Sequence, residues 1–109
     1  MKQYEIRWAD LPSPIGRRPV VLLTRTPAYD YLTKVIVAEV TSTIRGIPQE
    51  VVLGRKEGMQ ERCVANFDKV HVILKAALRE RAGALGTSRH REIKRALGYA
   101  LDWAELKVL

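Results

Sequence analysis

The segment GRRPVVLL, residues 16–23, decides the fold class of this chain. It ends in the continuous apolar run VVLL, which is too short for a helix. A run of this length is typical of a strand whose two faces are both covered. We therefore predict a central β-strand from Pro19 to Arg25 and a mainly β architecture around it.

A shorter β pattern precedes this segment. Residues Tyr4 to Ala9 have a strand-like composition. The pattern stops at Pro12 and Pro14, because proline cannot donate to a regular ladder. Gly16 then lets the chain turn. We expect a strand, a short loop and the central strand in succession.

The longest β pattern follows the central strand, from Lys34 to Ile44, where β-branched residues are frequent. Side chains alternate between the two faces of a strand. One face is therefore expected to carry Glu39, Thr41 and Thr43. The other face is expected to carry Ile36, Ala38, Val40, Ser42 and Ile44.

A hairpin and further strands are expected next. RGIP, residues 45–48, is a turn sequence, and Glu50 to Leu53 is predicted to return beside the preceding strand and close a hairpin. Cys63 to Leu74 loses its alternation in the middle, which indicates a bulge or two short strands. Weaker patterns predict a helical turn over Ala76 to Glu80 and a last strand over Ala82 to Leu85.

The C-terminal part predicts one amphipathic helix. Its apolar positions follow helical spacing and are Ile93, Ala96, Leu97, Ala100 and Leu101. Thr87 or Ser88 is expected to cap its start. The opposite face is expected to be solvated and holds Arg89, Arg91, Lys94 and Arg95. Together these patterns predict a single domain over residues 1–109, a small curved sheet or barrel with the helix packed on it.

The composition restricts the classes of function. The chain has 109 residues, of which 47% are hydrophobic and 28% charged, and this balance is typical of a globular domain rather than a fibrous or disordered protein. Nineteen Lys and Arg against twelve Asp and Glu give a net charge of +7. An acidic partner, either nucleic acid or an acidic protein, is therefore expected.

The chain lacks the sequence features of disulfide-bonded, membrane-spanning, secreted and metal-binding proteins. The single cysteine, Cys63, cannot form an intramolecular disulfide and is expected in the core of a cytoplasmic protein. No apolar stretch has the length of a membrane span, and the first residues lack the apolar core of a signal peptide. The two histidines, His71 and His90, belong to no metal-spaced cluster, so no metal site is expected.

Four blocks of the chain resemble the MazF/PemK family of endoribonuclease toxins, in the same order and at nearly the same spacing. They are IRWADL at 6–11, GRRPVVLL at 16–23, the segment 37–50 containing TSTIRGIP, and LG at 53–54 through VANFD at 64–68. Each block alone is a weak pattern. Together they cover nearly the whole chain and form a specific match.

The resemblance implies an SH3-like barrel that forms a homodimer and cuts single-stranded RNA at a short sequence without a cofactor. It also implies neutralisation by an acidic antitoxin of the MazE kind. The family's essential arginine immediately precedes the proline that opens the second strand, and Arg18 before Pro19 occupies that place. The family's essential hydroxyl residue falls on Thr41, with Ser42 beside it. Arg18 and Thr41 are thus the expected catalytic residues.

Both residue types suit the expected chemistry. RNA carries its own nucleophile, because its 2′-hydroxyl attacks the adjacent phosphorus, expels the 5′-oxygen and leaves a 2′,3′-cyclic phosphate. The protein then has to position the strand and stabilise charge. A guanidinium that stays protonated holds two non-bridging oxygens at once, as expected of Arg18, and the Thr41 hydroxyl adds a hydrogen bond.

Six further side chains are expected to bind RNA or support catalysis: Arg17, Glu39, Ser42, Arg45, Lys69 and His71. Glu39 and His71 are alternative general bases, although an outward Glu on a strand is usually only solvated. Lys69 and His71 differ from the residues usual in the family, and the loop at 12–17 is short and lacks any acid or amide. The recognised RNA sequence therefore does not transfer from the family.

Two other functions stay open. A gyrase poison resembling CcdB would share the fold without nuclease activity, and Trp103 near the C-terminus gives it slight support. Arg18 and Thr41 favour the nuclease. A non-catalytic RNA-binding module usually displays several aromatic residues for base stacking, and these make up only 6% of this chain.

Overall fold

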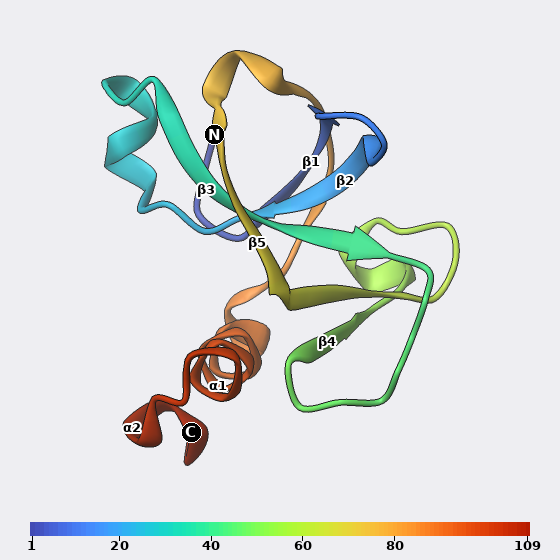
Figure 1. Ribbon diagram of the computed structural model, residues 1–109, viewed down its shortest axis with the longest axis vertical. Helices are drawn as coiled ribbons and strands as arrows, with labels where there is room; N and C mark the ends of the chain where they lie inside the picture. Colours follow the sequence, from blue (N-terminus) through green and yellow to red (C-terminus); the bar gives the residue numbers. More distant parts are fainter.

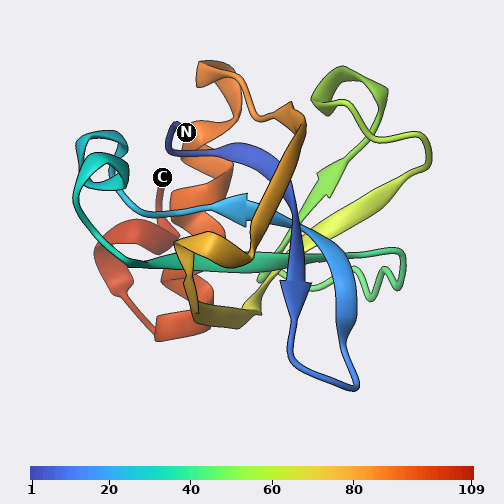
Figure 2. The ribbon, with the colours of Figure 1, turned by 90° about the horizontal axis from the view of Figure 1, so that it is seen from above.

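The computed structural model describes residues 1–109 and contains one six-stranded antiparallel sheet followed by two helices (Figure 1). The strands are β1 (Glu5–Leu11), β2 (Gly16–Leu22), β3 (Lys34–Thr41), β4 (Glu50–Leu53), β5 (Cys63–Leu74) and β6 (Leu78–Ala84). The helices are α1 (His90–Leu101) and α2 (Ala104–Lys107). With the strand order β4-β5-β3-β2-β1-β6, the sheet curls into half a barrel (Figure 2). This confirms the predicted mainly β class with a C-terminal helix.

β2 is the central strand that its apolar run predicts. It pairs with β1 on one side and with β3 on the other. Val21 belongs to a core on one face of the sheet, while Val20 and Leu22 belong to a second core on the opposite face. The consecutive apolar residues therefore supply both faces. The strand ends at Leu22 and not at Arg25, because a 3-10 turn with proline at its start follows at Thr26–Asp30.

The larger core lies between the sheet and α1, which is the amphipathic helix predicted from its spacing. Ile93 and Ala96 are buried in this core, whereas Leu101 at the helix end is exposed. The predicted cap at Thr87 or Ser88 is wrong, because a 3-10 turn over Thr87–Arg89 leads directly into the helix and no side chain caps it. No helix is long and apolar enough to cross a membrane.

The predicted hairpin is also wrong, because β4 pairs with β5 and not with β3. β5 lies between the two and pairs with both, so β3 has a strand from later in the chain as its neighbour. The segment between β3 and β4 is therefore a wide loop and not a hairpin turn. β3 ends at Thr41, short of the predicted Ile44. The loop is held by the Glu50 carboxylate, whose Oε1 accepts hydrogen bonds from the backbone N–H groups of Arg45 (3.1 Å) and Gly46 (2.9 Å).

The predicted irregularity in β5 is confirmed as a bulge. Ala38 of β3 lies opposite Val70, but its neighbour Glu39 lies opposite Asn66, so residues 67–69 have no partner in β3. Downstream, the predicted helical turn over Ala76 to Glu80 is only the 3-10 turn Lys75–Ala77. The last strand accordingly begins earlier than Ala82, at Leu78, and ends at Ala84.

Two glycines fix the segment between β4 and β5 against β6. Gly58 has a φ of +91°, and a Cβ there would lie 2.3 Å from the carbonyl oxygen of Ala82. A Cβ on Gly83 would lie 1.8 Å from the carbonyl oxygen of Glu57. Both obstacles are backbone atoms. The two segments therefore touch backbone to backbone, and only glycine fits at this contact.

We predict that Gly83→Ala destabilises the protein by about 1–3 kcal/mol, because the added methyl group overpacks this contact. Urea unfolding monitored by circular dichroism measures the change. Gly86→Ala is the matched control, since a Cβ there meets nothing within 4 Å and its φ of −68° suits alanine. Equal unfolding midpoints for the two variants would contradict the close contact.

Candidate active site

A buried carboxylate lies at the centre of the candidate active site. Glu39 of β3 is only 3% exposed, although the sequence favoured a solvated side chain at this position. Its Oε1 accepts a hydrogen bond from Arg18 Nη1 at 3.0 Å, and its Oε2 lies 2.5 Å from His71 Nε2. We call Arg18, Glu39 and His71 the Glu39 cluster.

The strand register explains why these three side chains meet. Glu39 lies opposite Val20 of β2, and Arg18 emerges on the same face as Val20, two positions along the strand. On the other side of β3, His71 of β5 lies opposite Val37, which shares the face of Glu39. Arg18 and His71 are thus diagonal neighbours of Glu39, within reach of long side chains.

Burial makes the two partners of Glu39 necessary. An ionised carboxylate removed from water is costly unless it is paired and hydrogen-bonded. Arg18 and His71 provide this pairing, and each side chain is itself 31% exposed. The cluster therefore places one fixed anion below two groups that reach the solvent.

The contact with Glu39 determines what the His71 ring offers to a ligand. A carboxylate can only accept, so this contact favours the tautomer in which His71 Nε2 carries the proton and donates it to Oε2. In the neutral form of that tautomer the lone pair is on Nδ1, which makes no hydrogen bond within the protein. Arg18 likewise uses only Nη1, so its Nε and Nη2 donors are free. The cluster therefore has a basic nitrogen and a guanidinium available to a ligand.

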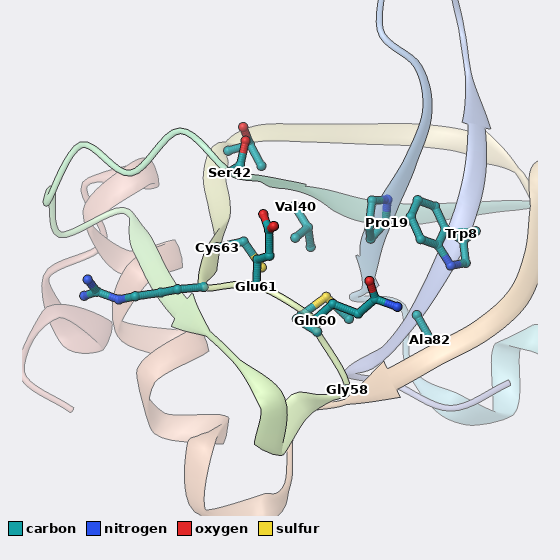
Figure 3. A pocket seen from close by; sticks show the side chains of 12 residues that line it. Trp8, Pro19, Val40, Ser42, Gly58, Gln60, Glu61, Cys63 and Ala82 are labelled. Carbon is teal, nitrogen blue, oxygen red and sulfur yellow. The ribbon is translucent and has the colours of Figure 1, made fainter.

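Thr41 lies on the same strand and on the same face as Glu39, two residues further along. Its Oγ1 accepts a hydrogen bond from the Thr43 backbone N–H at 3.2 Å, which leaves the hydroxyl proton free to donate. Ser42, beside it, is exposed. Both residues line a pocket of about 480 Å³ at the end of β3 (Figure 3).

This pocket joins two strand ends to the segment that precedes β5. Trp8 of β1 and Pro19 of β2 form one side, and the loop residues Gln60 and Glu61 lie across from them (Figure 3). Sequence reasoning missed Trp8 and Gln60 as site residues. Their meeting depends on the glycine contact between residues 57–58 and 82–83, which no local pattern reveals.

The remaining predicted residues do not join the Glu39 cluster. The Arg17 guanidinium pairs with Glu80 and lies 5.5 Å from the centre of the Trp8 ring. Arg45 contributes its backbone N–H to Glu50 in the wide loop. Lys69 is half-buried in the β5 bulge and forms no ion pair.

Two observations describe the remaining chemistry of the site. Cys63 also lines the pocket, and burial together with the negative charge of Glu57 raises the pKa of its thiol. The thiol is therefore protonated at neutral pH and is a poor nucleophile. No three His, Cys, Asp or Glu side chains gather where they would hold a metal ion.

Comparison with known proteins places the chain among the toxins that its sequence resembles. A family model described as PemK-like, MazF-like toxin of type II toxin-antitoxin system matches residues 2–101. The chain is 40% identical over 99 residues to probable endoribonuclease MazF5 of Mycobacterium tuberculosis, and the match covers 90% of each chain. The solved structure of the M. tuberculosis toxin MazF-mt6 is 33% identical, has a TM-score of 0.85 and covers 90% of this chain and 96% of its own.

A second solved structure shares the fold at lower identity. It is an endoribonuclease in complex with its cognate antitoxin from a mycobacterial species, with 21% identity, a TM-score of 0.81 and coverage of 94% of this chain and 96% of its own. The fold and the matches together define an endoribonuclease. The chain belongs to the PemK-like, MazF-like family of toxins of type II toxin-antitoxin systems. Nothing in these matches supports the gyrase-poison alternative.

Proposed function

We propose that the protein cuts single-stranded RNA without a metal ion, by directing the RNA's own 2′-hydroxyl at the adjacent phosphorus. The O2′–P bond forms and the P–O5′ bond breaks, which leaves a 2′,3′-cyclic phosphate and a 5′-hydroxyl end. The observation that carries the proposal is the Glu39 cluster, which pairs a phosphate-binding cation with a base over one buried anion.

Arg18 is proposed to hold the scissile phosphate. Its free Nε and Nη2 donors suit two non-bridging oxygens, and the ion pair with Glu39 fixes the direction of the guanidinium. The Thr41 hydroxyl, on the same face, adds a further donor to the charge that develops on the phosphorane oxygens. Ser42, which lines the pocket beside Thr41, is proposed to contact the RNA there.

His71 is proposed as the general base. Its free Nδ1 takes the proton of the 2′-hydroxyl, and the leaving 5′-oxygen takes a proton from water. Glu39 is the poorer candidate for the base, because it is buried and both of its oxygens are already engaged. We assign Glu39 a positioning role, since it keeps the His71 proton on Nε2 and the lone pair on Nδ1.

The partners are proposed from charge and from the family. A net charge of +7 attracts RNA and also an acidic antitoxin of the MazE kind, which would neutralise the toxin in the cytoplasm. The side chains of Arg17, Arg45 and Lys69 are proposed to contact the RNA backbone outside the Glu39 cluster. Each of them is exposed or half-buried.

A homodimer is proposed from an exposed apolar face. Neighbouring positions of β3 and β5 on one side of the sheet leave Ile36, Val72 and Leu74 exposed by 43%, 67% and 56%. Leu101 of α1 is 63% exposed and lines the same groove as Ile36. A contiguous apolar patch of this kind is typical of a protein interface, and we propose a second copy of the chain as its partner.

The variant Arg18→Ala is expected to cut RNA about 100–1000 times more slowly than the unchanged protein, because one donor to the developing charge is lost. The assay uses a long single-stranded RNA in EDTA and maps the cut positions and end groups. Arg91→Ala is the matched control, since Arg91 is exposed on α1 and forms no ion pair. Cutting that requires a divalent metal, or that survives in Arg18→Ala, would contradict the proposal.

The roles of His71 and Glu39 are separable by pH. If His71 is the base, the fall in kcat/KM at acidic pH should be absent in His71→Gln, which should retain only a small residual rate. Glu39→Gln should lower kcat with little change in KM, because an amide orients the ring without compensating its charge. If kcat/KM of His71→Gln still falls at acidic pH as in the unchanged protein, His71 is not the general base, and Glu39 or another group takes that role.

The dimer is tested by the variant Val72→Lys, which places a charge in the middle of the apolar face. Light scattering after size-exclusion chromatography should change from the mass of two chains to that of one. Val52→Lys serves as control, because Val52 is 40% exposed on β4, outside that face. A monomeric unchanged protein, or a dimeric Val72→Lys variant, would contradict the assignment.

A further inference from the structure

We propose that the pocket beside Thr41 binds one unstacked nucleobase of the RNA, with Trp8 against the base and Gln60 reading its edge. This inference rests on the proposed cleavage of RNA and adds a residue that determines the recognised sequence. It concerns a different surface from the Glu39 cluster, because Trp8, Pro19 and Val40 lie on the opposite face of the sheet from Arg18 and Glu39.

The walls of the pocket have the chemistry that a nucleobase requires. Val40 and Cys63 line the pocket, and the Trp8 indole lies at one side of it (Figure 3). Its volume of about 480 Å³ accommodates a planar base together with water. Small-molecule sites are typically apolar hollows with a few convergent polar groups, and an aromatic side chain in them offers a surface for stacking.

Gln60 supplies the polar group. Its side chain is exposed and makes no hydrogen bond within the protein, and its amide extends across the pocket toward Trp8 (Figure 3). An amide carries both a donor and an acceptor, so it matches the paired groups on the edge of a base. Glu61 also lines the pocket, and its carboxylate disfavours a phosphate there but accepts from a base N–H.

The segment that carries Gln60 is held in place before any ligand arrives. Buried Glu57 accepts one hydrogen bond from the Gly54 N–H (2.8 Å) and pairs with Arg89 of the turn before α1 (3.0 Å). The Met59 N–H donates to the Gly54 carbonyl at 3.0 Å. With the glycine contact to β6, these bonds fix the wall opposite Trp8, so binding does not have to order this wall.

The neighbouring surface provides a path for the RNA backbone. Thr41 lines the pocket and also lies on the catalytic face, so it connects the two. On the far side, residues 60–62 separate the pocket from a hollow of about 540 Å³. Arg55, Lys56 and Arg62 line that hollow and form no ion pairs, so they are free to bind phosphates. We therefore propose that an RNA whose scissile phosphate lies at Arg18 runs past Thr41, places a base in the pocket and continues over these three cationic side chains.

The first test is the sequence profile of cleavage in a randomised RNA pool. Gln60→Glu exchanges the amide donor for a second acceptor, and it should change the preference at one position near the cut by about tenfold. Gln60→Ala should relax the preference at the same position. Lys94→Ala, an exposed change on α1, should keep the original profile. An unchanged profile in both Gln60 variants would overturn the proposal.

The second test measures binding without cleavage. In a Trp103→Phe background, Trp8 is the remaining tryptophan and reports on the pocket. A short RNA in which only the 2′-hydroxyl at the cleavage position is replaced by hydrogen should quench Trp8 fluorescence, and Gln60→Ala should weaken this binding. Binding without quenching would overturn the nucleobase pocket. Quenching by this probe, together with no cleavage of the same sequence when its 2′-hydroxyl groups are intact, would instead refute only the proposed cleavage.

Discussion

The burial of the Glu39 carboxylate is the constraint on which the rest of the site depends. A charge that is 3% exposed in the middle of a sheet needs partners, and β2 and β5 supply them from either side. In the proposed function, the Arg18 pairing directs the guanidinium toward an incoming phosphate, and the His71 contact favours the tautomer with its proton on Nε2. Three adjacent strands thus deliver one preorganised group of side chains, with little reorganisation left for the substrate to induce.

In the two proposals, the same sheet also separates the chemistry from the recognition of the RNA. The face that carries Glu39 also holds Arg18 and His71, while the opposite face opens into the pocket of Trp8 and Gln60. Thr41 lies where β3 ends and the two regions meet. Because the wall of the pocket is a loop held by Glu57 and two glycines, its residues can vary without disturbing the Glu39 cluster.

Local patterns predicted the elements of the fold well, and their partners poorly. The apolar run at 20–23 and the spacing of Ile93 and Ala96 depend on burial of the element itself, so β2 and α1 were found correctly. The insertion of β5 between β3 and β4 joins segments that are not consecutive in the sequence, and the burial of Glu39 is set by its two neighbouring strands. The family resemblance pointed to Arg18 and Thr41, but the contact between Glu39 and His71 and the meeting of Trp8 with Gln60 required the three-dimensional structure.

The most direct test of the account is the nitrogen NMR spectrum of His71, recorded in a His90→Asn variant so that a single histidine remains. For the neutral ring, the account predicts the tautomer with its proton on Nε2, hydrogen-bonded to Glu39. Addition of an RNA that keeps its 2′-hydroxyl groups but has a methylene group in place of the bridging 5′-oxygen at the cut, so that it binds without being cleaved, should then shift the Nδ1 signal and leave the Nε2 proton in place. A proton on Nδ1, or an Nδ1 signal that is unchanged when the RNA is bound, would contradict the account.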